Sequence, residues 1–179
     1  MIYILSSNTY KQRSVIDENV NDSVLQPILR KSQNKVKRLL GTDLYNDILT
    51  NIDNGTVTPE QESLLNDYVV NFLVAINDYN VVPFLNYKLT NISLSKKTSD
   101  NSASSALDEV KWIRENVLKS EVADLEKEMI DFLNGNIDDY PLFKESRYYR
   151  CDPNDLNTNL SQIFIPQDED DIEFRYKNR

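Results

Sequence analysis

Apolar residues recur at intervals of three and four positions along most of the chain, a spacing that gathers them on one face of a helix. The first such segment runs from about Ser23 to Leu40, and Asn21 or Asp22 is suited to cap its first turn. Pro27 falls close to the start of this segment, where its missing N–H is tolerated. The pattern therefore predicts an amphipathic helix with one buried face.

Two further helices follow in the same pattern. One is predicted from Asp43 to about Asp53, with Thr42 as its cap. The other begins after Thr58, which can cap the helix while Gln61 returns a hydrogen bond in a capping box. Its apolar stripe is expected at Leu64, Leu65, Tyr68, Val69, Phe72, Leu73, Ile76 and Tyr79.

The second half of the chain predicts one long helix after an interruption. Pro83 is expected to break or kink the preceding helix, with a short helical piece from Phe84 to Leu89. The small polar residues from Ser93 to Ser105 predict a loop. The longest helix is expected from about Ala106 to Asn134, with Trp112 and Ile130 on the face opposite its apolar stripe. These two residues are candidates for contacts with a partner.

The glycines support an all-α protein. Gly41, Gly55 and Gly135 each follow a predicted helix, where a left-handed backbone conformation often ends the helical hydrogen bonding. We expect a small bundle of four to five helices over residues 1–139, followed by an extended tail over residues 140–179. The tail carries short strand-like segments. Its candidate interface residues are Tyr148, Tyr149, Ile163, Phe164, Ile165, Ile172, Phe174 and Tyr176.

Composition excludes several kinds of chemistry. The chain has no histidine, and Cys151 is its only cysteine, so the commonest general base is absent and a thiol nucleophile has no histidine partner. The acidic residues lack the spacing and the turn glycine of a calcium loop. We therefore expect no catalytic residues, no cofactor and no metal site, and we expect the protein not to be an enzyme. No apolar run is long enough to predict a membrane span.

One cluster of charge stands apart from the acidic whole. The formal charge is −9, yet no acidic residue occurs between Asp22 and Asp43. The basic residues of that interval are Arg30, Lys31, Lys35, Lys37 and Arg38. They favour pairing with acidic helices of the same domain. They also suit contact with an acidic partner, such as a second copy of this chain, and less well contact with DNA.

The segment from Asn21 to Asn54 resembles the head–tail connector (adaptor) proteins of tailed bacteriophages. The resemblance lies in Val24-Leu25-Gln26-Pro27-Ile28 and in Leu39-Leu40-Gly41-Thr42-Asp43-Leu44-Tyr45, and more loosely extends from Val15 to Gly135. It is nearest to the branch found in phages of gut Bacteroidetes, including the ring proteins of crAss-like phages. The long C-terminal tail is a departure from that pattern.

The resemblance implies a structural virion protein. Members of that family form rings, commonly of twelve copies, beneath the capsid portal, and contact the portal protein and adjacent neck or tail proteins. DNA passes through such a ring without specific binding, and an acidic channel would repel its phosphates. The expected location is the neck of a virion assembled in the host cytoplasm.

Two other classes of function remain open from the residues alone. One is a small acidic helical regulator or defence-inhibiting protein, whose acidic residues should gather on one face and bind a host protein. The other is an all-α enzyme that uses carboxylates and a divalent metal, which predicts stabilisation by that metal.

Overall fold

The computed structural model describes residues 3–89, 94–96 and 107–150, and the side chains within that part except those of residues 86–89, 94–96 and 107. One compact unit extends from Met1 to Tyr149, and a second unit begins at Arg150. The predicted tail contacts at Ile163, Phe164, Ile165, Ile172, Phe174 and Tyr176 lie outside the described residues.

The described part is mostly helical, as the periodicity predicts. The first half contains α1 (Ser7–Arg13), α2 (Asp22–Leu40), α3 (Thr42–Asn54), α4 (Pro59–Ser63), the π-helical segment η1 (Leu64–Val69) and α5 (Val70–Asn86). A hairpin of β1 (Tyr87–Leu89) and β2 (Leu94–Lys96) follows. The second half contains α6 (Leu107–Ile113), the π-helical segment η2 (Arg114–Leu118), α7 (Lys119–Gly135) and the 3-10 helix η3 (Pro141–Glu145).

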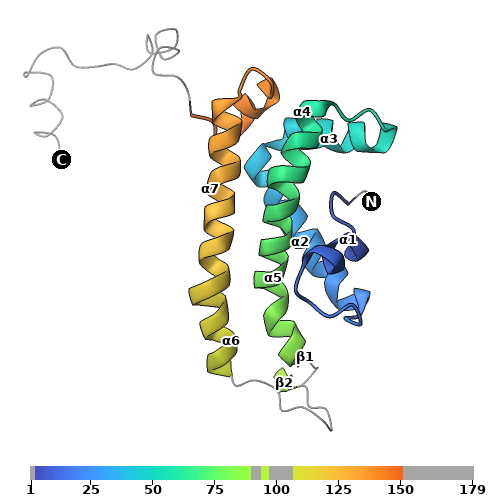
Figure 1. Ribbon diagram of the computed structural model, residues 1–179, viewed down its shortest axis with the longest axis vertical. Coiled ribbons are helices and arrows are strands. Elements are labelled where there is room, and N and C mark those ends of the chain that lie inside the picture. The colour runs from blue at the N-terminus through green and yellow to red at the C-terminus, as the bar shows by residue number, and fades with distance from the viewer. Residues whose placement is uncertain (1–2, 90–93, 97–106, 151–179) are drawn as a thin grey trace, which may run out of the picture. The chain divides into compact units, whose positions relative to one another are not determined.

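The core is built around α4, η1 and α5, which form one uninterrupted helix. Both α2 and α7 pack against α5 (Figure 1). The buried apolar residues of the central helix are Leu64, Leu65, Val69, Val70, Phe72, Leu73, Ala75, Ile76 and Val81. Because α5 has neighbours on more than one side, its apolar residues are not confined to a single stripe.

The helix from Pro59 to Leu85 is the one in the described part that is long and apolar enough to cross a membrane, with a mean hydropathy of 1.2. No single apolar run revealed this, because polar residues interrupt the segment. Its apolar side chains include the completely buried Leu64 and Phe72, which lie at the centre of the core. Of its most apolar stretch of 18 residues, 44% is buried in the bundle.

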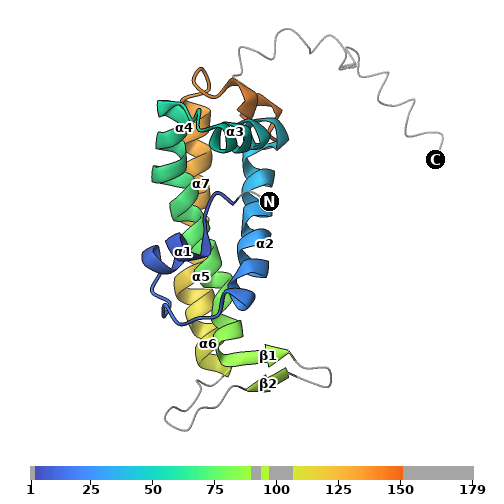
Figure 2. The same cartoon turned by 90° about the vertical axis from the view of Figure 1, so that its right-hand side faces the viewer.

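Helices α2 and α6–α7 run in the same direction. Each extends from the region near the β1–β2 hairpin toward the end that carries α3 and η3, while α5 runs the opposite way (Figures 1 and 2). An ion pair spans the two flanking helices, with Lys35 Nζ 3.0 Å from Glu126 Oε1. The bundle therefore presents two parallel helices on a central antiparallel one.

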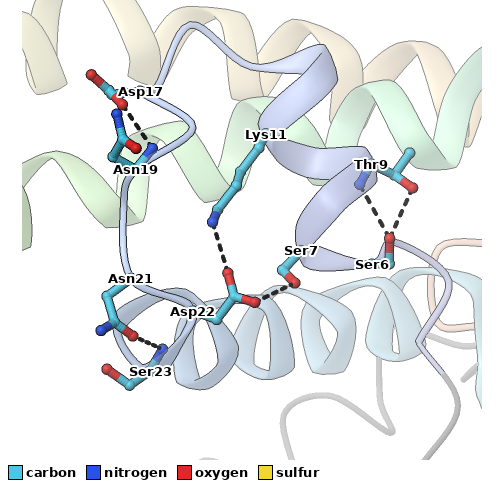
Figure 3. Close-up of polar contacts among 9 residues, drawn as sticks. All are labelled: Ser6, Ser7, Thr9, Lys11, Asp17, Asn19, Asn21, Asp22 and Ser23. Atoms are coloured by element: carbon cyan, nitrogen blue, oxygen red, sulfur yellow. Dashed lines mark hydrogen bonds and ion pairs between the residues drawn. The ribbon is translucent and has the colours of Figure 1, made fainter.

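The N-terminal helix α1 was not predicted from the pattern. Polar contacts hold it against the start of α2 (Figure 3), where Asp22 forms an ion pair with Lys11 at 2.8 Å and accepts a hydrogen bond from the Ser7 hydroxyl at 3.2 Å. The Lys11 ammonium lowers the pKa of the Asp22 carboxyl. On its other side α1 contributes Tyr10, which is completely buried.

The chain after α7 returns to the core. Tyr140 and Phe143 are buried, and the Tyr140 hydroxyl donates a 2.6 Å hydrogen bond to the carbonyl of Glu60. The Ser146 hydroxyl donates a 2.7 Å hydrogen bond to the carbonyl of Leu39 at the end of α2. The domain boundary expected at residue 139 thus falls inside the compact unit, which continues to Tyr149.

Several predicted helix ends are correct. Helix α2 begins at Asp22, and Asn21 caps it through a 2.8 Å hydrogen bond from the Ser23 amide. Thr58 caps α4 as expected, and Pro59 is its first residue. Gly55 adopts the left-handed conformation that ends α3, with φ of 67°. Local sequence is enough to specify these ends.

Other local expectations were wrong. Thr42 is the first residue of α3 and not its cap, which is Gly41. Gln61 does not complete a capping box, because its side chain donates a 2.7 Å hydrogen bond to Asp47 on α3. Gly135 is the last residue of α7 and does not have a positive φ. A tertiary contact redirects Gln61 away from the local partner that its spacing suggests.

Pro83 does not break the helix, which continues to Asn86. A proline cannot donate to the carbonyl four residues earlier, here that of Tyr79. The guanidinium of Arg114 supplies the missing donor, with Nε 3.1 Å from the Tyr79 carbonyl oxygen. The short helical piece expected from Phe84 to Leu89 is instead the end of α5 and strand β1, and Leu94–Lys96, expected in a loop, is strand β2.

Candidate interaction surfaces

The basic residues of α2 divide into two groups. Lys35 pairs with Glu126 on α7, and Lys37 lies 5.8 Å from the centre of the Tyr45 ring. Arg30, Lys31 and Arg38 are exposed, and the described part of the chain provides none of them with an ion-pair partner. Ion pairing within the domain therefore explains the presence of a basic residue at Lys35, but not at these three positions.

The outer helix α6–η2–α7 has a face that nothing in the described unit covers. Trp112, Ile113 and Val117 are exposed to 61%, 40% and 47%, and no residue of η2 is buried. Farther along the helix the exposed acidic residues are Glu121, Asp124, Glu128 and Asp131. Exposed large apolar side chains beside charged ones on a helix are typical of a contact surface.

Trp112 and Ile130 are not both exposed, as the sequence suggested. Ile130 is only 8% exposed and belongs to the core. The segment after α7 covers this end of the helix, since the Asn134 amide donates a 3.2 Å hydrogen bond to the carbonyl of Tyr148 one turn beyond Ile130. Tyr148 and Tyr149 are half-buried at the edge of the core. Trp112 remains the exposed member of the predicted pair.

A groove of about 740 Å³ lies between α5, α7 and the segment that follows α1. Its lining residues are Arg13, Val15, Asn71, Val74, Ala75, Asp78, Leu118, Glu121 and Leu125. Asp78 accepts hydrogen bonds from the Tyr10 hydroxyl at 2.7 Å and from the Ser14 hydroxyl at 2.5 Å. Burial, together with Asp78, raises the pKa of Tyr10 well above its ordinary value. These bonds hold α1 on the bundle.

No set of three acidic or cysteine side chains within residues 3–85 and 108–150 is placed to hold a metal ion. The acidic residues near one another on α7, such as Asp124 and Glu128, line an open groove beside Tyr68. Tyr68 stacks on Phe132 with the ring centres 4.1 Å apart, which closes the groove's apolar floor.

Asn77 is a polar core residue that the sequence reasoning missed. It is completely buried in α5, and neither its amide nitrogen nor its amide oxygen has a hydrogen-bond partner in the described part of the protein. Leu73 and Val81, one turn before and after it, are also buried. Helical spacing alone would therefore have placed Asn77 in the core. An unpaired buried amide lowers the free energy of unfolding.

The fold and these surfaces define a helical bundle protein with exposed charged and apolar faces. The chain belongs to a family of unknown function, DUF6712, whose model matches residues 36–153. That range begins near the end of α2 and includes every later helix and strand of the described unit, but not α1. No curated protein matches the chain, and no solved structure does.

Proposed function

We propose that this protein is a head–tail connector of a tailed bacteriophage, a structural virion protein that forms a ring between the capsid portal and the tail. The observation that carries the proposal is the corner between α2 and α3, which the second segment of the resemblance, Leu39 to Tyr45, forms. Gly41 forms this corner with φ of 86°, a conformation that glycine adopts far more readily than other residues. The buried residues around it are Leu39, Leu40, Leu44 and Tyr45.

The corner depends on close packing against a distant segment of the chain, and not only on its local residue pattern. A Cβ atom on Gly41 would lie 3.2 Å from the backbone of Ser146, whose hydroxyl bonds to the Leu39 carbonyl. The short motif therefore meets a distant part of the chain. A residue pattern with such packing requirements supports common ancestry better than an amphipathic pattern alone.

The test is to locate the protein in phage particles. Purified virions should contain it in multiple copies per portal ring, and electron microscopy should place a ring of it directly below the portal. A portal gene next to the gene for this chain would support the same conclusion. Its absence from purified, infectious virions of a phage that encodes it would overturn the proposal.

A second candidate is the acidic regulator that binds a host protein. It is favoured by the acidic residues on one face of α7, Glu121, Asp124, Glu128 and Asp131. This candidate predicts a complex with one host protein at equal copy number and no incorporation into particles. Affinity purification from infected cells, followed by measurement of the mass of the complex, separates the two candidates.

A further inference from the structure

The uncovered face of the outer helix is continuous along α6, η2 and α7. It has an apolar end at Ile113 and Val117 and an acidic end at Glu121, Asp124 and Glu128. Glu121, Asp124 and Glu128 follow one another in α7 at intervals of three and four positions, so they lie along one side of that helix. Like the basic residues Arg30, Lys31 and Arg38, these three acidic residues form no ion pair within the described part of the chain.

The exposed face of α2 has the opposite charge. Arg30, Lys31 and Arg38 occupy the side of α2 away from its buried residues Leu25, Leu29 and Val36. Glu121 borders the groove beside α5, and Asp124 and Glu128 border the groove beside Tyr68. None of the three pairs with a cation of α2 in the same molecule. The α2 side chain that does reach α7, Lys35, uses Glu126, which belongs to neither face.

We propose that the outer face of α6–α7 in one copy packs against the exposed face of α2 in the next copy. The second copy is the partner because the two faces are complementary in charge and spacing. Exposed positions follow one another on α2 as Pro27, Lys31, Asn34 and Arg38, and on the outer helix as Val117, Glu121, Asp124 and Glu128. Both sets have the same intervals and extend over about 17 Å at 1.5 Å per residue.

The direction of the helices allows the two sets of positions to lie opposite one another in order. Helices α2 and α6–α7 run the same way within one copy (Figure 2). Rotation about an axis along the bundle therefore brings α7 of one copy beside α2 of the next in parallel. In that arrangement Lys31 meets Glu121 and Arg38 meets Glu128. The contact is heterologous, so repetition produces a closed ring or a filament.

This inference deepens the proposed function, and its biological meaning rests on that function. Charges at an interface fix register and speed association, while exposed apolar groups such as Val117 contribute through burial. Salt screens the charged part over a Debye length of about 8 Å at physiological ionic strength. Association should accordingly weaken as salt is raised.

The experiment is a charge exchange read out by sedimentation of the full chain. The basic-face variant carries Lys31→Glu and Arg38→Glu, and the acidic-face variant carries Glu121→Lys and Glu128→Lys. We expect each variant alone to self-associate at least about 100-fold more weakly than the wild type. An equimolar mixture of the two should recover association to within about tenfold of wild type, because each contact again joins opposite charges.

A chain with all four substitutions retains the formal net charge of −9 and should also self-associate. The matched controls are Lys144→Glu and Glu145→Lys, two exposed positions of η3 outside both faces, which should leave association unchanged. Circular dichroism and thermal unfolding verify that every variant retains the fold.

Three results would overturn the inference: single-face variants that associate like the wild type, a mixture that fails to recover, or a wild type that stays monomeric at about 1 mM in low salt. These outcomes are separable from failure of the connector function. A connector whose ring uses other contacts would appear in virions although the exchange has no effect. A protein absent from virions could still show the exchange in solution.

Discussion

The guanidinium of Arg114 donates a 3.1 Å hydrogen bond to the carbonyl of Tyr79, the carbonyl that Pro83 leaves without a helical donor. The guanidinium also lies 4.3 Å from the centre of the Tyr79 ring. A side chain of η2 thereby supplies the hydrogen-bond donor that the backbone of α5 lacks at this position. This contact explains how a proline is accommodated inside the central helix.

The Arg114–Tyr79 contact predicts that the effect of replacing Arg114 depends on whether Pro83 is present. Arg114→Met should lower the free energy of unfolding by about 1–2 kcal/mol, because the carbonyl of Tyr79 loses its donor. In a Pro83→Ala background the backbone amide of the new alanine can donate instead, so the same substitution should cost about 1 kcal/mol less. Urea denaturation of the four proteins measures the difference.

The control for this comparison of four proteins is Lys111→Met, a substitution at an exposed position of α6. Its effect on the free energy of unfolding should be the same with and without Pro83. Additive effects of Arg114→Met and Pro83→Ala, within about 0.5 kcal/mol, would show that Arg114 does not compensate for the proline.

The Tyr10–Asp78 hydrogen bond predicts a dependence of stability on alkaline pH. Burial, followed by the effect of Asp78, raises the pKa of Tyr10, so the folded protein keeps the Tyr10 proton after the unfolded chain has lost it. Stability is therefore complete below about pH 10, the pKa of an unfolded tyrosine, and falls as the pH rises above it. Tyr10→Phe removes the part of the pH dependence of stability that comes from Tyr10, because phenylalanine does not titrate.

Tyr10→Phe should lower the free energy of unfolding by about 1–3 kcal/mol at pH 8, since Asp78 loses a buried donor. At pH 11 the gap between the two proteins should shrink by about 1.4 kcal/mol. Tyr140, whose pKa burial raises to about 12, titrates equally in both proteins and cancels from the comparison. Urea denaturation at both pH values provides the measurement, and an unchanged gap would refute the assignment to Tyr10.

Replacement of Asn77 should stabilise the protein. Asn77→Leu keeps the number of side-chain heavy atoms and removes two polar groups that have no hydrogen-bond partner in the described part of the protein. We expect the free energy of unfolding to rise by about 1–3 kcal/mol, measured by chemical denaturation. Asn80→Leu is the comparison, because Asn80 is half-buried and its amide lies 3.5 Å from the Ser32 hydroxyl. A less stable Asn77→Leu protein would contradict the prediction.

Gly41 should tolerate substitution least among the glycines. Gly41→Ala combines a positive φ of 86° with a Cβ position 3.2 Å from the Ser146 backbone, and should lower the melting temperature through a loss of about 1–3 kcal/mol. Gly135→Ala meets nothing within 4 Å, has no positive φ and lies in a helix, so it should be neutral or stabilising by up to about 1 kcal/mol. Equal melting temperatures for the two variants would mean that the α2–α3 corner is not under this constraint.

Helical periodicity was a reliable guide to where helices lie, and a poorer guide to how they end and what they face. The predicted range of α2 differs from the structure by one residue at its start, because an N-cap and an apolar stripe are both local properties. The predicted break at Pro83 did not occur because Arg114, which is distant in sequence, supplies the missing donor. The same limitation affected the surfaces, since Ile130, expected on an exposed face, is buried in the core.

The sequence by itself determined the mostly helical character of the described part, the basic side of α2 and the capping of α4 by Thr58, since each depends on residues within a turn or two. The tertiary structure decided which cations stay unpaired, which apolar face stays open and how Gly41 is constrained. These features depend on contacts between distant residues, such as that from Ser146 to Leu39 across 107 positions. Such contacts form only when helices pack, and no local pattern encodes them.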